Sequence, residues 1–403
     1  MIGAVPGTGR RNLTFDEALA EVRALALDLP AEPVPLEHLA GRVLAEDVRA
    51  RGDHPAFTNS AMDGFALRAA DAATGEAQRL VGESRAGAPF TAALGPGEAI
   101  RISTGAELPE GADAILRLED AVEEGEGVRA ATAPPAGAFV RRRGEDVHVG
   151  QALLSAGRVV GPHEVAVVAA AGHARVACLR RPRVAVLGSG DEVVAAGGEL
   201  GPGQVYDANR PGVAAQAEWA GARVVASAVV PDDHAATVAA LAGLMDGGQG
   251  ESPDLLVTTG GVSVGRHDHL RPALEACGVR EILYGVRIRP GHPLWLGRRG
   301  GQLVLGLPGN PVSAAVCFHA FGRPLLGRAD SWEHRMPMAA RYVKGTPRTE
   351  LVRCREEDGA LRPLPRQGSH AVTSLAGATH LAVVDAARRE VSPGERVRTM
   401  RLV

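Results

Sequence analysis

The feature that most constrains the fold is an alternation of two kinds of apolar segment between residues 183 and 326. Short, continuous apolar runs, as in buried strands, occur at residues 184–187, 224–229, 254–257 and 303–305. Longer runs with helical character occur near residues 212–220, 234–245, 270–277 and 312–326. Parallel strands that helices cover on both faces have this continuous apolar texture. The alternation therefore predicts a doubly wound, mostly parallel α/β domain.

The N-terminal part of the chain contains two helical signals. Thr14 and Glu17 have the spacing of a capping box, which predicts a helix over residues 18–29. A second, short helix is expected over residues 36–43. The texture then changes near residue 48, which marks the end of this part.

Two further parts of the chain have the texture of β-structure. From about residue 48 to residue 147, Gly and Pro break short apolar segments, which predicts a small β-rich domain with strands such as 98–102 and 114–118. Beyond residue 333, a period-two pattern in segments such as 379–384 predicts a small C-terminal β-barrel or sandwich. A chain of 403 residues is also too long for one ordinary core, so several domains are expected.

Composition excludes several classes of function. The formal net charge is only −3, which gives the chain no global electrostatic reason to bind nucleic acid or an anionic membrane. The sequence has no signal-peptide core and no apolar run near the roughly 18 to 20 residues of a membrane span. The cysteines have no close spacing, which indicates free thiols buried in a reducing compartment: Cys178, Cys277, Cys317 and Cys354. We therefore expect a cytoplasmic protein.

Loops rich in Gly or Pro follow three of the predicted strands, at residues 188–192, 259–263 and 307–311. Because ligands bind beyond the carboxyl ends of the strands in an open α/β sheet, these loops are expected to share one rim. Gly260 and Gly261 let the backbone approach a ligand closely, and Asn310 before Pro311 has the order of an N-cap and a first helical residue. Such loops favour anions, so the rim predicts a phosphate or another oxyanion. Taken singly, each glycine loop is better explained as a tight turn, and it is the occurrence of three at one rim that favours a ligand site.

Ser263 lies in a segment that formally matches the nucleophile elbow of serine hydrolases, G-x-S-x-G. An elbow requires a helix directly after the serine, whereas Pro272 indicates that the helix begins near Leu270 or Arg271. The chain also lacks an HGGG-like oxyanion loop. We favour the interpretation that the Ser263 hydroxyl and nearby backbone amides hold an anion, and the serine hydrolase stays the alternative.

Acidic side chains in two loops are candidate ligands of a hard cation. Asp268 lies between His267 and His269, and one carboxylate of this kind suffices for Mg²⁺ that bridges phosphate oxygens and keeps its waters. Asp232 and Asp233 form a second acidic pair, for which a solvated turn or a helix cap is the simpler explanation. In an extended segment the two histidines would point away from Asp268, so the triplet is not a ready set of three ligands.

These motifs, in this order and spacing, resemble the molybdopterin molybdenumtransferases, the MoeA type to which the gephyrin E-domain belongs. The matching segments cover most of the chain: residues 59–66 (NSAMDGFA), 102–106 (ISTGA), 141–146 (RRRGED), 190–192 (GDE), 206–209 (YDAN), 259–265 (TGGVSVG) with Asp268, and 307–311 (LPGNP). Each motif alone is weak, but together they are specific.

The resemblance implies the fold, the reaction and the partners. It implies a discontinuous N-terminal linker domain (1–48 with 148–180), a β-rich domain (49–147), a molybdopterin-binding α/β domain (181–328) and a C-terminal β-barrel (329–403). The implied enzyme is a transferase that inserts molybdate into adenylylated molybdopterin, with Mg²⁺ and release of AMP. It implies a homodimer whose active site lies between subunits, and the molybdopterin adenylyltransferase is a candidate partner.

The resemblance also assigns roles to residues of this chain. The implied catalytic residues are Asp63, Thr104, Glu192, Asp232, Asp268 and Arg289, of which Asp63 and Asp268 are the implied metal ligands. The implied substrate-binding residues are Arg141, Asp146, Gly260, Gly261, Ser263, Pro308, Asn310, Pro311, Arg366 and Ser369.

One segment departs from the family pattern. Relatives usually have K-x-x-x-K-P-G-K-P-L, whereas this chain has Gly285, Arg289 and His292 at the lysine positions. Arg287 lies two residues before Arg289, so positive charge is retained, although arginine and lysine are not equivalent ligands for an oxyanion. A non-catalytic molybdopterin-binding or scaffold protein, and an enzyme that inserts tungstate, therefore stay as alternatives.

Overall fold

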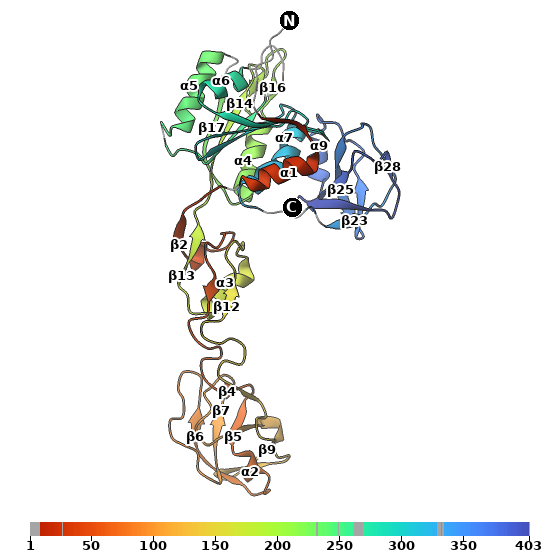
Figure 1. The fold of residues 1–403 in the computed structure, drawn as a ribbon. Coiled ribbons are helices and arrows are strands. Elements are labelled where there is room, and N and C mark those ends of the chain that lie inside the picture. Colours follow the sequence, from red (N-terminus) through yellow and green to blue (C-terminus); the bar gives the residue numbers. More distant parts are fainter. Residues whose placement is uncertain are drawn as a thin grey trace. The chain divides into compact units, whose positions relative to one another are not determined.

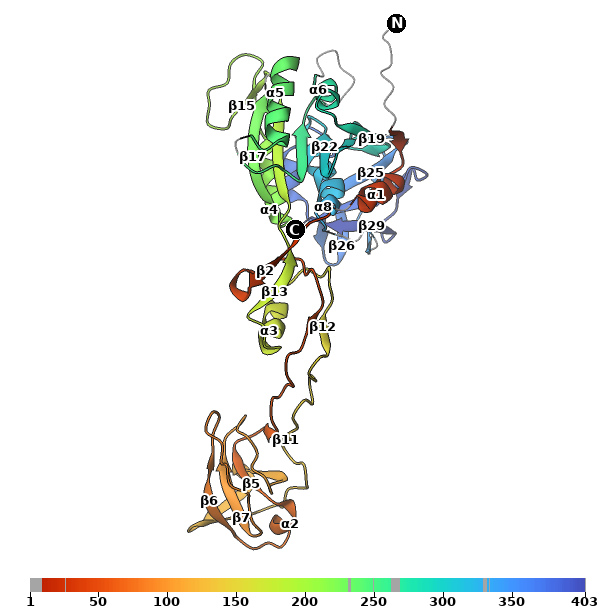
Figure 2. The ribbon, with the colours of Figure 1, turned by 60° about the vertical axis from the view of Figure 1, so that its left-hand side comes forward.

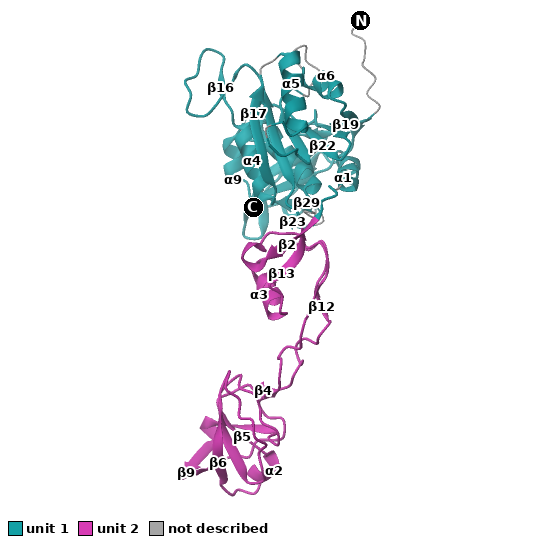
Figure 3. Cartoon of the chain, turned by 90° about the vertical axis from the view of Figure 1, so that its left-hand side faces the viewer, with its two compact units in different colours: residues 1–30, 180–403 teal, residues 31–179 magenta. Residues whose placement is uncertain are grey.

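The computed structural model describes residues 9–402 except 26, 231–232, 249, 262–268, 329–331 and 333. The chain divides into two compact units, residues 1–30 with 180–403 and residues 31–179 (Figure 3). None of the helices in the described ranges combines the length and the apolar character that crossing a membrane requires.

The first unit is built on a seven-stranded sheet in the order β1-β19-β21-β22-β18-β14-β17. Four of its strands run parallel and form one side of the sheet: β14 (Arg183–Ser189), β17 (Arg223–Val230), β18 (Leu255–Thr259) and β22 (Gln302–Leu307). These are the four strands that the alternation predicted, with ends that differ by one or two residues: three are longer at both ends, and β18 begins one residue later and ends two residues later than predicted. The doubly wound α/β fold is therefore confirmed.

Helices cover both faces of this sheet, because successive side chains of a strand point to opposite faces. On β14, Val184 and Val186 pack into one core with α4 (Asn209–Trp219) and α7 (Pro311–Cys317), whereas Ala185 and Leu187 pack into another. The second core contains α5 (His234–Met245) and α6 (Leu270–Ala276). Figure 1 shows α5 and α6 together, apart from α4 and α7.

The helix expected over residues 312–326 is not one regular helix. After α7 the chain forms a π-helical segment, η3 (Phe318–Gly322), and then α8 (Arg323–Leu325). All of η3 is buried, and Phe321 packs edge-on against Phe15 at 5.9 Å between ring centroids. Tertiary packing of large aromatic rings thus accompanies the change in helical hydrogen bonding, which the local sequence does not reveal.

The N-terminal residues belong to this same unit. Strand β1 (Arg10–Leu13) pairs in parallel with β19 (Arg280–Val286), and α1 (Phe15–Ala24) begins with the predicted capping box of Thr14 and Glu17. The helix is shorter than the predicted 18–29 at its C-terminal end. The resemblance implies that residues 1–48 join residues 148–180, whereas residues 10–24 pack against the α/β sheet.

Antiparallel strands complete the first unit. Strand β21 (Trp295–Arg299) pairs with both β19 and β22. The predicted C-terminal β-domain is a six-stranded sheet, coloured blue in Figure 1, in the order β20-β25-β27-β29-β23 with β26 on β25. Its strands are β20 (Ile288–Arg289), β23 (Arg335–Pro337), β25 (Thr349–Glu357), β26 (Ala360–Pro363), β27 (His380–Val384) and β29 (Arg396–Arg401). The smaller elements are β24 (Tyr342–Val343) with β28 (Glu390–Val391), and α9 (Thr373–Gly377).

The second unit contains the predicted β-rich domain. Its main sheet has the order β8-β5-β7-β6-β10-β9: β8 (Ala114–Arg117), β5 (Gly64–Leu67), β7 (Glu98–Ile102), β6 (Gln78–Ser84), β10 (Gly127–Ala130) and β9 (Ala121–Glu124). Three two-stranded pairs accompany it: β2 (Ala31–Pro35) with β13 (Arg175–Leu179), β3 (Val48–Arg49) with β12 (Ala152–Leu154), and β4 (Asn59–Ser60) with β11 (Val140–Arg141). Its helical elements are η1 (Leu36–His38), α2 (Ala69–Ala72), η2 (Leu118–Asp120) and α3 (Pro162–Ala170).

The helix predicted over residues 36–43 is wrong beyond the short η1. Val43 forms an isolated bridge with Val159, and the next residue, Leu44, forms one with Cys178. Leu44 and Cys178 are both fully buried in the core of this segment. The long-range pairing that buries these side chains therefore overrides the local helical pattern.

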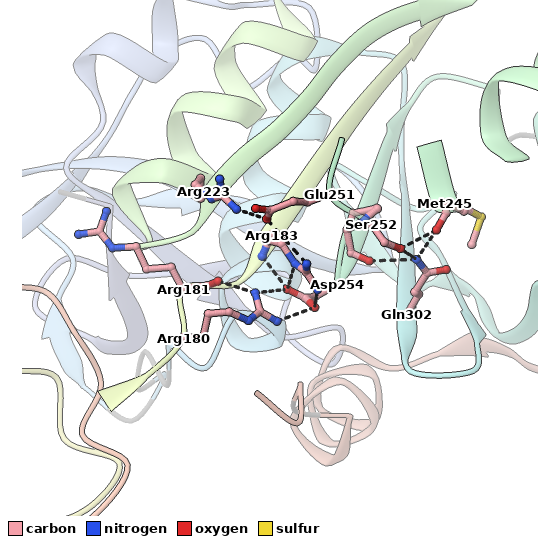
Figure 4. A network of polar contacts seen from close by, with 10 residues as sticks. Arg180, Arg181, Arg183, Arg223, Met245, Glu251, Ser252, Asp254 and Gln302 are labelled. Carbon is pink, nitrogen blue, oxygen red and sulfur yellow. Dashed lines mark hydrogen bonds and ion pairs between the residues drawn. The ribbon is translucent and has the colours of Figure 1, made fainter. Parts of the chain in front are cut away.

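A network of charged groups fixes the amino ends of β14 and β18, opposite to the strand ends that carry the Gly-rich loops (Figure 4). The Asp254 carboxylate accepts bonds from both terminal nitrogens of Arg180, each at 2.9 Å, and from the Arg183 backbone N–H at 2.7 Å. Arg183 and Arg223 both pair with Glu251. The side chain of Asp254 is only 15% exposed, so these ion pairs hold the amino ends of β14 and β18 together largely away from solvent.

Candidate functional site

A cavity of about 550 Å³ opens at the carboxyl ends of β14, β18 and β22. All three predicted loops contribute to its wall: Gly188, Ser189, Gly190 and Glu192 from the first, Thr259, Gly260 and Gly261 from the second, and Pro308, Gly309, Asn310 and Pro311 from the third. The loop between β14 and α4, which carries β15 (Val193–Val194) and β16 (Val205–Tyr206), extends from this region (Figure 2). The structure thus brings the three loops to one rim, as the sequence predicted.

The glycines of the second loop are required by two features of the backbone. Gly260 and Gly261 have φ values of +84° and +64°, a region that residues with a Cβ rarely adopt. A Cβ at Gly261 would lie 2.9 Å from Leu270 Cβ and 3.0 Å from Ser189 Oγ. The chain therefore passes so close to its neighbours that only glycine fits at Gly261.

The third loop is tied to its neighbours by backbone and side-chain bonds. The Gly260 N–H donates to the Leu307 carbonyl oxygen at 3.2 Å, and the Asn209 side-chain amide donates to the Gly309 carbonyl oxygen at 2.7 Å. Asn310 occupies the N-cap position of α7 with Pro311 next, as expected, but its side chain makes no capping bond. The Asn310 side chain is therefore not used by the helix that follows it.

Glu192 and Asp207 are the acidic side chains of the cavity wall within the described ranges, and only one of them is free. The Asp207 side chain is 4% exposed and accepts bonds from the Arg210 N–H at 3.0 Å and the Arg210 Nε at 2.8 Å. Glu192 is exposed, and its carboxylate lies against Gly190, where a Cβ would come within 2.5 Å of its oxygen. Glu192 is thus the carboxylate that can meet a cation or a ligand.

Several predicted site residues lie outside the described residues: Asp232, Ser263, His267 and Asp268. Asp233 is described, and its carboxylate caps α5 by accepting from the Ala236 N–H at 2.8 Å, as the simpler explanation predicted. His269 occupies the N-cap position of α6, with its ring 6.5 Å from that of His234. Among the residues that the structure describes, no three His, Cys, Asp or Glu side chains cluster as a metal site.

The implied partner-domain residues lie together on the second unit. The Asp63 carboxylate accepts from the Thr104 N–H at 2.7 Å and from the Thr104 hydroxyl at 3.1 Å, both through Oδ1. Arg141 pairs with Asn59 on β4, the strand that precedes Asp63. Asp146 donates its N–H to the His54 carbonyl oxygen at 3.1 Å. Asp63, Thr104, Arg141 and Asp146 are all exposed.

Arg289 does not line the cavity. Its guanidinium pairs with Glu350 at 3.2 Å, and the Glu350 side chain is only 3% exposed. Glu350 also accepts from the Tyr342 hydroxyl at 2.7 Å and the Gly345 N–H at 3.0 Å. The cation that the family motif places at this position is therefore committed to a buried carboxylate.

The loop with Arg366 and Ser369 lies beside the start of α7. The Ser369 carbonyl oxygen accepts from the Val312 N–H at 3.2 Å, and the Arg366 carbonyl oxygen accepts from Arg353 at 3.0 Å. Arg366 is exposed. This motif therefore adjoins the third loop of the cavity through backbone contacts, whereas neither side chain lines the cavity.

Arg353 is a residue that we did not single out in the sequence. Its side chain is fully buried, and burial lowers its pKa to about 10. It donates to Ser374 Oγ at 2.8 Å and to backbone carbonyls, and one terminal nitrogen has no partner among the residues that the structure describes. A lone arginine inside the apolar run from Leu351 to Cys354 was the signal that could have found it.

Comparisons with known proteins agree with this architecture. Residues 13–172 match the model of the MoeA N-terminal region (domain I and II), residues 185–328 that of a probable molybdopterin binding domain, and residues 335–402 that of the MoeA C-terminal region (domain IV). The molybdopterin molybdenumtransferase of Haemophilus influenzae is 33% identical over 399 residues, which cover 96% of this chain and 97% of that protein. The Synechococcus elongatus protein of the same name is 35% identical, over 94% of this chain and 96% of that protein. The crystal structure of a molybdopterin biosynthesis MoeA protein from Pyrococcus horikoshii superposes with a TM-score of 0.80 at 29% identity, covering 97% of this chain and 99% of that one. The chain therefore belongs to the molybdopterin molybdenumtransferase family.

Proposed function

We propose that this protein is an enzyme of molybdenum cofactor biosynthesis that inserts molybdate into adenylylated molybdopterin and releases AMP. One observation carries the proposal: three loops with close-fitting glycines and prolines line a single cavity of about 550 Å³ in the segment that matches a molybdopterin-binding model. A cavity of this size suits a ligand of several hundred daltons. The two relatives are named molybdopterin molybdenumtransferases, and the chain matches them over nearly their full length.

The residues of the wall have complementary roles in this proposal. Backbone amides near Gly260 and Gly261, with the Ser263 hydroxyl, hold the phosphate groups, since backbone N–H groups in such loops bind anions. Pro308 and Pro311 keep the third loop rigid beside Asn310. Arg366 and Ser369 support the oxyanion end of the site through the loop that meets α7.

The proposed Mg²⁺ site uses Asp63 and Asp268, with Thr104, Glu192 and Asp232 as further catalytic residues. Asp63 suits this role because both of its contacts with Thr104 involve Oδ1, which leaves Oδ2 without a partner among the described residues. A bound Mg²⁺ would offset the charge of the phosphate groups. Asp63 and Asp268 would hold it through carboxylate oxygens.

The proposed active site lies between two subunits, so that Asp63, Thr104, Arg141 and Asp146 of one subunit serve the cavity of the other. Mixing two inactive variants tests this arrangement. A heterodimer of Asp63→Asn and Asp268→Asn subunits would contain one site with both substitutions and one intact site. We expect mixed subunits to recover activity that neither variant has alone, whereas a site within one subunit would recover none.

The central test is a direct assay of the reaction. Purified protein is incubated with adenylylated molybdopterin, Mg²⁺ and molybdate, and AMP is measured together with bound pterin. Molybdate-dependent AMP release supports the enzyme. Pterin binding without AMP release would overturn it in favour of a binding or scaffold protein, for which the replaced lysines and the Arg289–Glu350 pair are the supporting observation. The same assay with tungstate decides which oxyanion is used, and pull-down with the adenylyltransferase tests that partner.

A further inference from the structure

We propose that Asn209 is a positioning residue of the cavity, which fixes the peptide between Gly309 and Asn310 so that its N–H faces the anionic ligand. This inference rests on the proposed function and adds a residue to it. Asn209 is the first residue of α4, lines the cavity and lies a hundred residues before its partner in the sequence. The resemblance gave it no role of its own.

The contact between Asn209 and Gly309 defines the direction of both groups. The Asn209 side-chain nitrogen lies 2.7 Å from the Gly309 carbonyl oxygen. A carbonyl oxygen can only accept, so the amide must present its NH₂ group and turn its own oxygen away. The orientation of the Asn209 amide is therefore fixed by chemistry, although oxygen and nitrogen are alike in shape.

The same contact fixes the direction of a free donor. In a trans peptide the C=O and the following N–H point in opposite directions, so holding the Gly309 oxygen also aims the Asn310 N–H. Among the residues described, no group accepts a hydrogen bond from the Asn310 N–H. If this peptide turned over, an acceptor oxygen would replace the donor that faces the ligand. Gly309 offers little steric resistance to such a rotation, because it has no Cβ.

The first turn of α4 is itself held firmly enough to act as a support. The buried Asp207 carboxylate accepts from the backbone N–H and the Nε of Arg210. Arg210 in turn donates to Ser227 Oγ on β17 at 2.9 Å. These bonds join the start of the helix to the sheet, so that Asn209 extends from a rigid element to a loop.

The other half of the Asn209 amide adds no hydrogen bond to the fold. Its oxygen Oδ1 is buried and has no hydrogen-bond partner among the described residues. A buried acceptor without a protein partner needs an explanation, which is strain, a bound water or ion, or a functional role. Gln216 on the same helix also has a buried amide oxygen without a partner in the described part of the chain, but it does not line the cavity. Gln216 is therefore a matched control.

The test compares Asn209→Leu with Gln216→Met, since both replace an amide by an uncharged apolar group of similar size. Calorimetry measures the Kd of adenylylated molybdopterin without molybdate, and the AMP assay gives KM and kcat. We expect Asn209→Leu to raise Kd and KM about tenfold, with kcat changed less than threefold, as for a contact made equally in the ground and transition states. Gln216→Met should change neither constant, and neither variant should lower the Tm.

Four outcomes would overturn the inference. These are an unchanged Kd in Asn209→Leu, an equal rise in Gln216→Met, a loss of activity that only follows a lower Tm, and a crystal structure of Asn209→Leu in which the Gly309 carbonyl keeps its direction. Failure of the proposed function gives a different result, because wild type would then bind the pterin nucleotide without releasing AMP. The ratio of the Kd of Asn209→Leu to that of wild type would still test the role of Asn209. Wild type that binds no pterin nucleotide would overturn both.

Discussion

Replacing Gly261 with alanine should damage the cavity more than the same change at its neighbour Gly260. The substitution has two costs. At φ +64° a residue with a Cβ is disfavoured by about 1–2 kcal/mol. The new Cβ would also meet Leu270 Cβ at 2.9 Å, and a Cβ atom cannot rotate away because it is attached directly to the backbone of α6. Overpacking of this kind costs about 1–3 kcal/mol.

The sum of about 2–5 kcal/mol exceeds what one surface loop can absorb without moving. Because about 1.4 kcal/mol corresponds to a factor of ten, we expect the Kd of adenylylated molybdopterin to rise at least about 30-fold. Gly260→Ala is the matched control, since its φ of +84° carries the conformational cost but its Cβ would meet Ser189 Oγ at a milder 3.3 Å. Its cost of about 1–2 kcal/mol should weaken binding by about 5- to 30-fold.

Calorimetric titration of both variants, with circular dichroism to confirm folding, measures this difference. Two results would refute the reasoning. If Gly261→Ala binds like wild type, the loop does not hold the ligand by close approach of its backbone. If Gly260→Ala and Gly261→Ala bind adenylylated molybdopterin equally weakly, the contact with Leu270 has no effect and the backbone conformation alone determines the loss of affinity.

Three further predictions concern charge. Asp63→Asn keeps the shape of the side chain but removes its charge, and AMP release should fall about 100-fold, a loss typical of one electrostatic group in an active site; activity within threefold of wild type would remove Asp63 from the site. Asp254→Asn should cost about 2–3 kcal/mol in urea unfolding at pH 7, since it leaves Arg180 and Arg183 partly buried without their anion. Burial raises the pKa of Asp254, but bonds from these arginines outweigh it and hold the pKa below its ordinary 3.8, so this stability should be present above about pH 4 and disappear below it. Burial lowers the pKa of His319 from 6.5 to about 3, so on acidification the unfolded chain gains a proton before the folded chain does. The free energy of unfolding should therefore fall as pH drops below about 6.5, by up to about 1.4 kcal/mol per pH unit. His319→Gln should flatten this slope, and an unchanged slope would contradict the assignment.

The parts of the fold that were predicted correctly have local causes. Helix α5 begins and ends at the predicted residues, His234 and Met245, because Asp233 caps it and an apolar run fills it. Strands β14, β18 and β22 were found because burial on both faces makes each one continuously apolar. Strand β17 lies at the edge of the sheet and is mostly not buried, and it was found from its apolar sequence alone. The three loops were placed at one rim because the ends of parallel strands coincide.

The parts that were missed depend on contacts between distant residues. The helix over residues 36–43 is displaced by bridges to Val159 and Cys178, more than a hundred residues away in both cases. The N-terminal strand β1 joins the α/β sheet by pairing with β19, some 270 residues later. Asn209 was visible in the motif YDAN, yet its bond to Gly309 depends on how a helix and a loop meet in space.

The departures from the family pattern at residues 285–294 acquire a different meaning in the structure. Gly285 has a φ of +78°, and a Cβ there would lie 3.0 Å from the Asn12 side chain, so the packing of β1 disfavours a lysine at this position. Arg289 is paired with Glu350, and hydrogen bonds from Tyr342 and Gly345 also hold the Glu350 carboxylate.

Neither Gly285 nor Arg289 lines the cavity, whereas Pro293 of the same segment does. The buried guanidinium of Arg353 bonds Ser374 and the carbonyl oxygens of Arg366 and Gly368, and among the described residues it makes no hydrogen bond to a carboxylate. The change at Arg289 therefore alters the contact between β20 and β25 rather than the wall of the cavity. The AMP-release assay decides whether the replaced lysines affect catalysis.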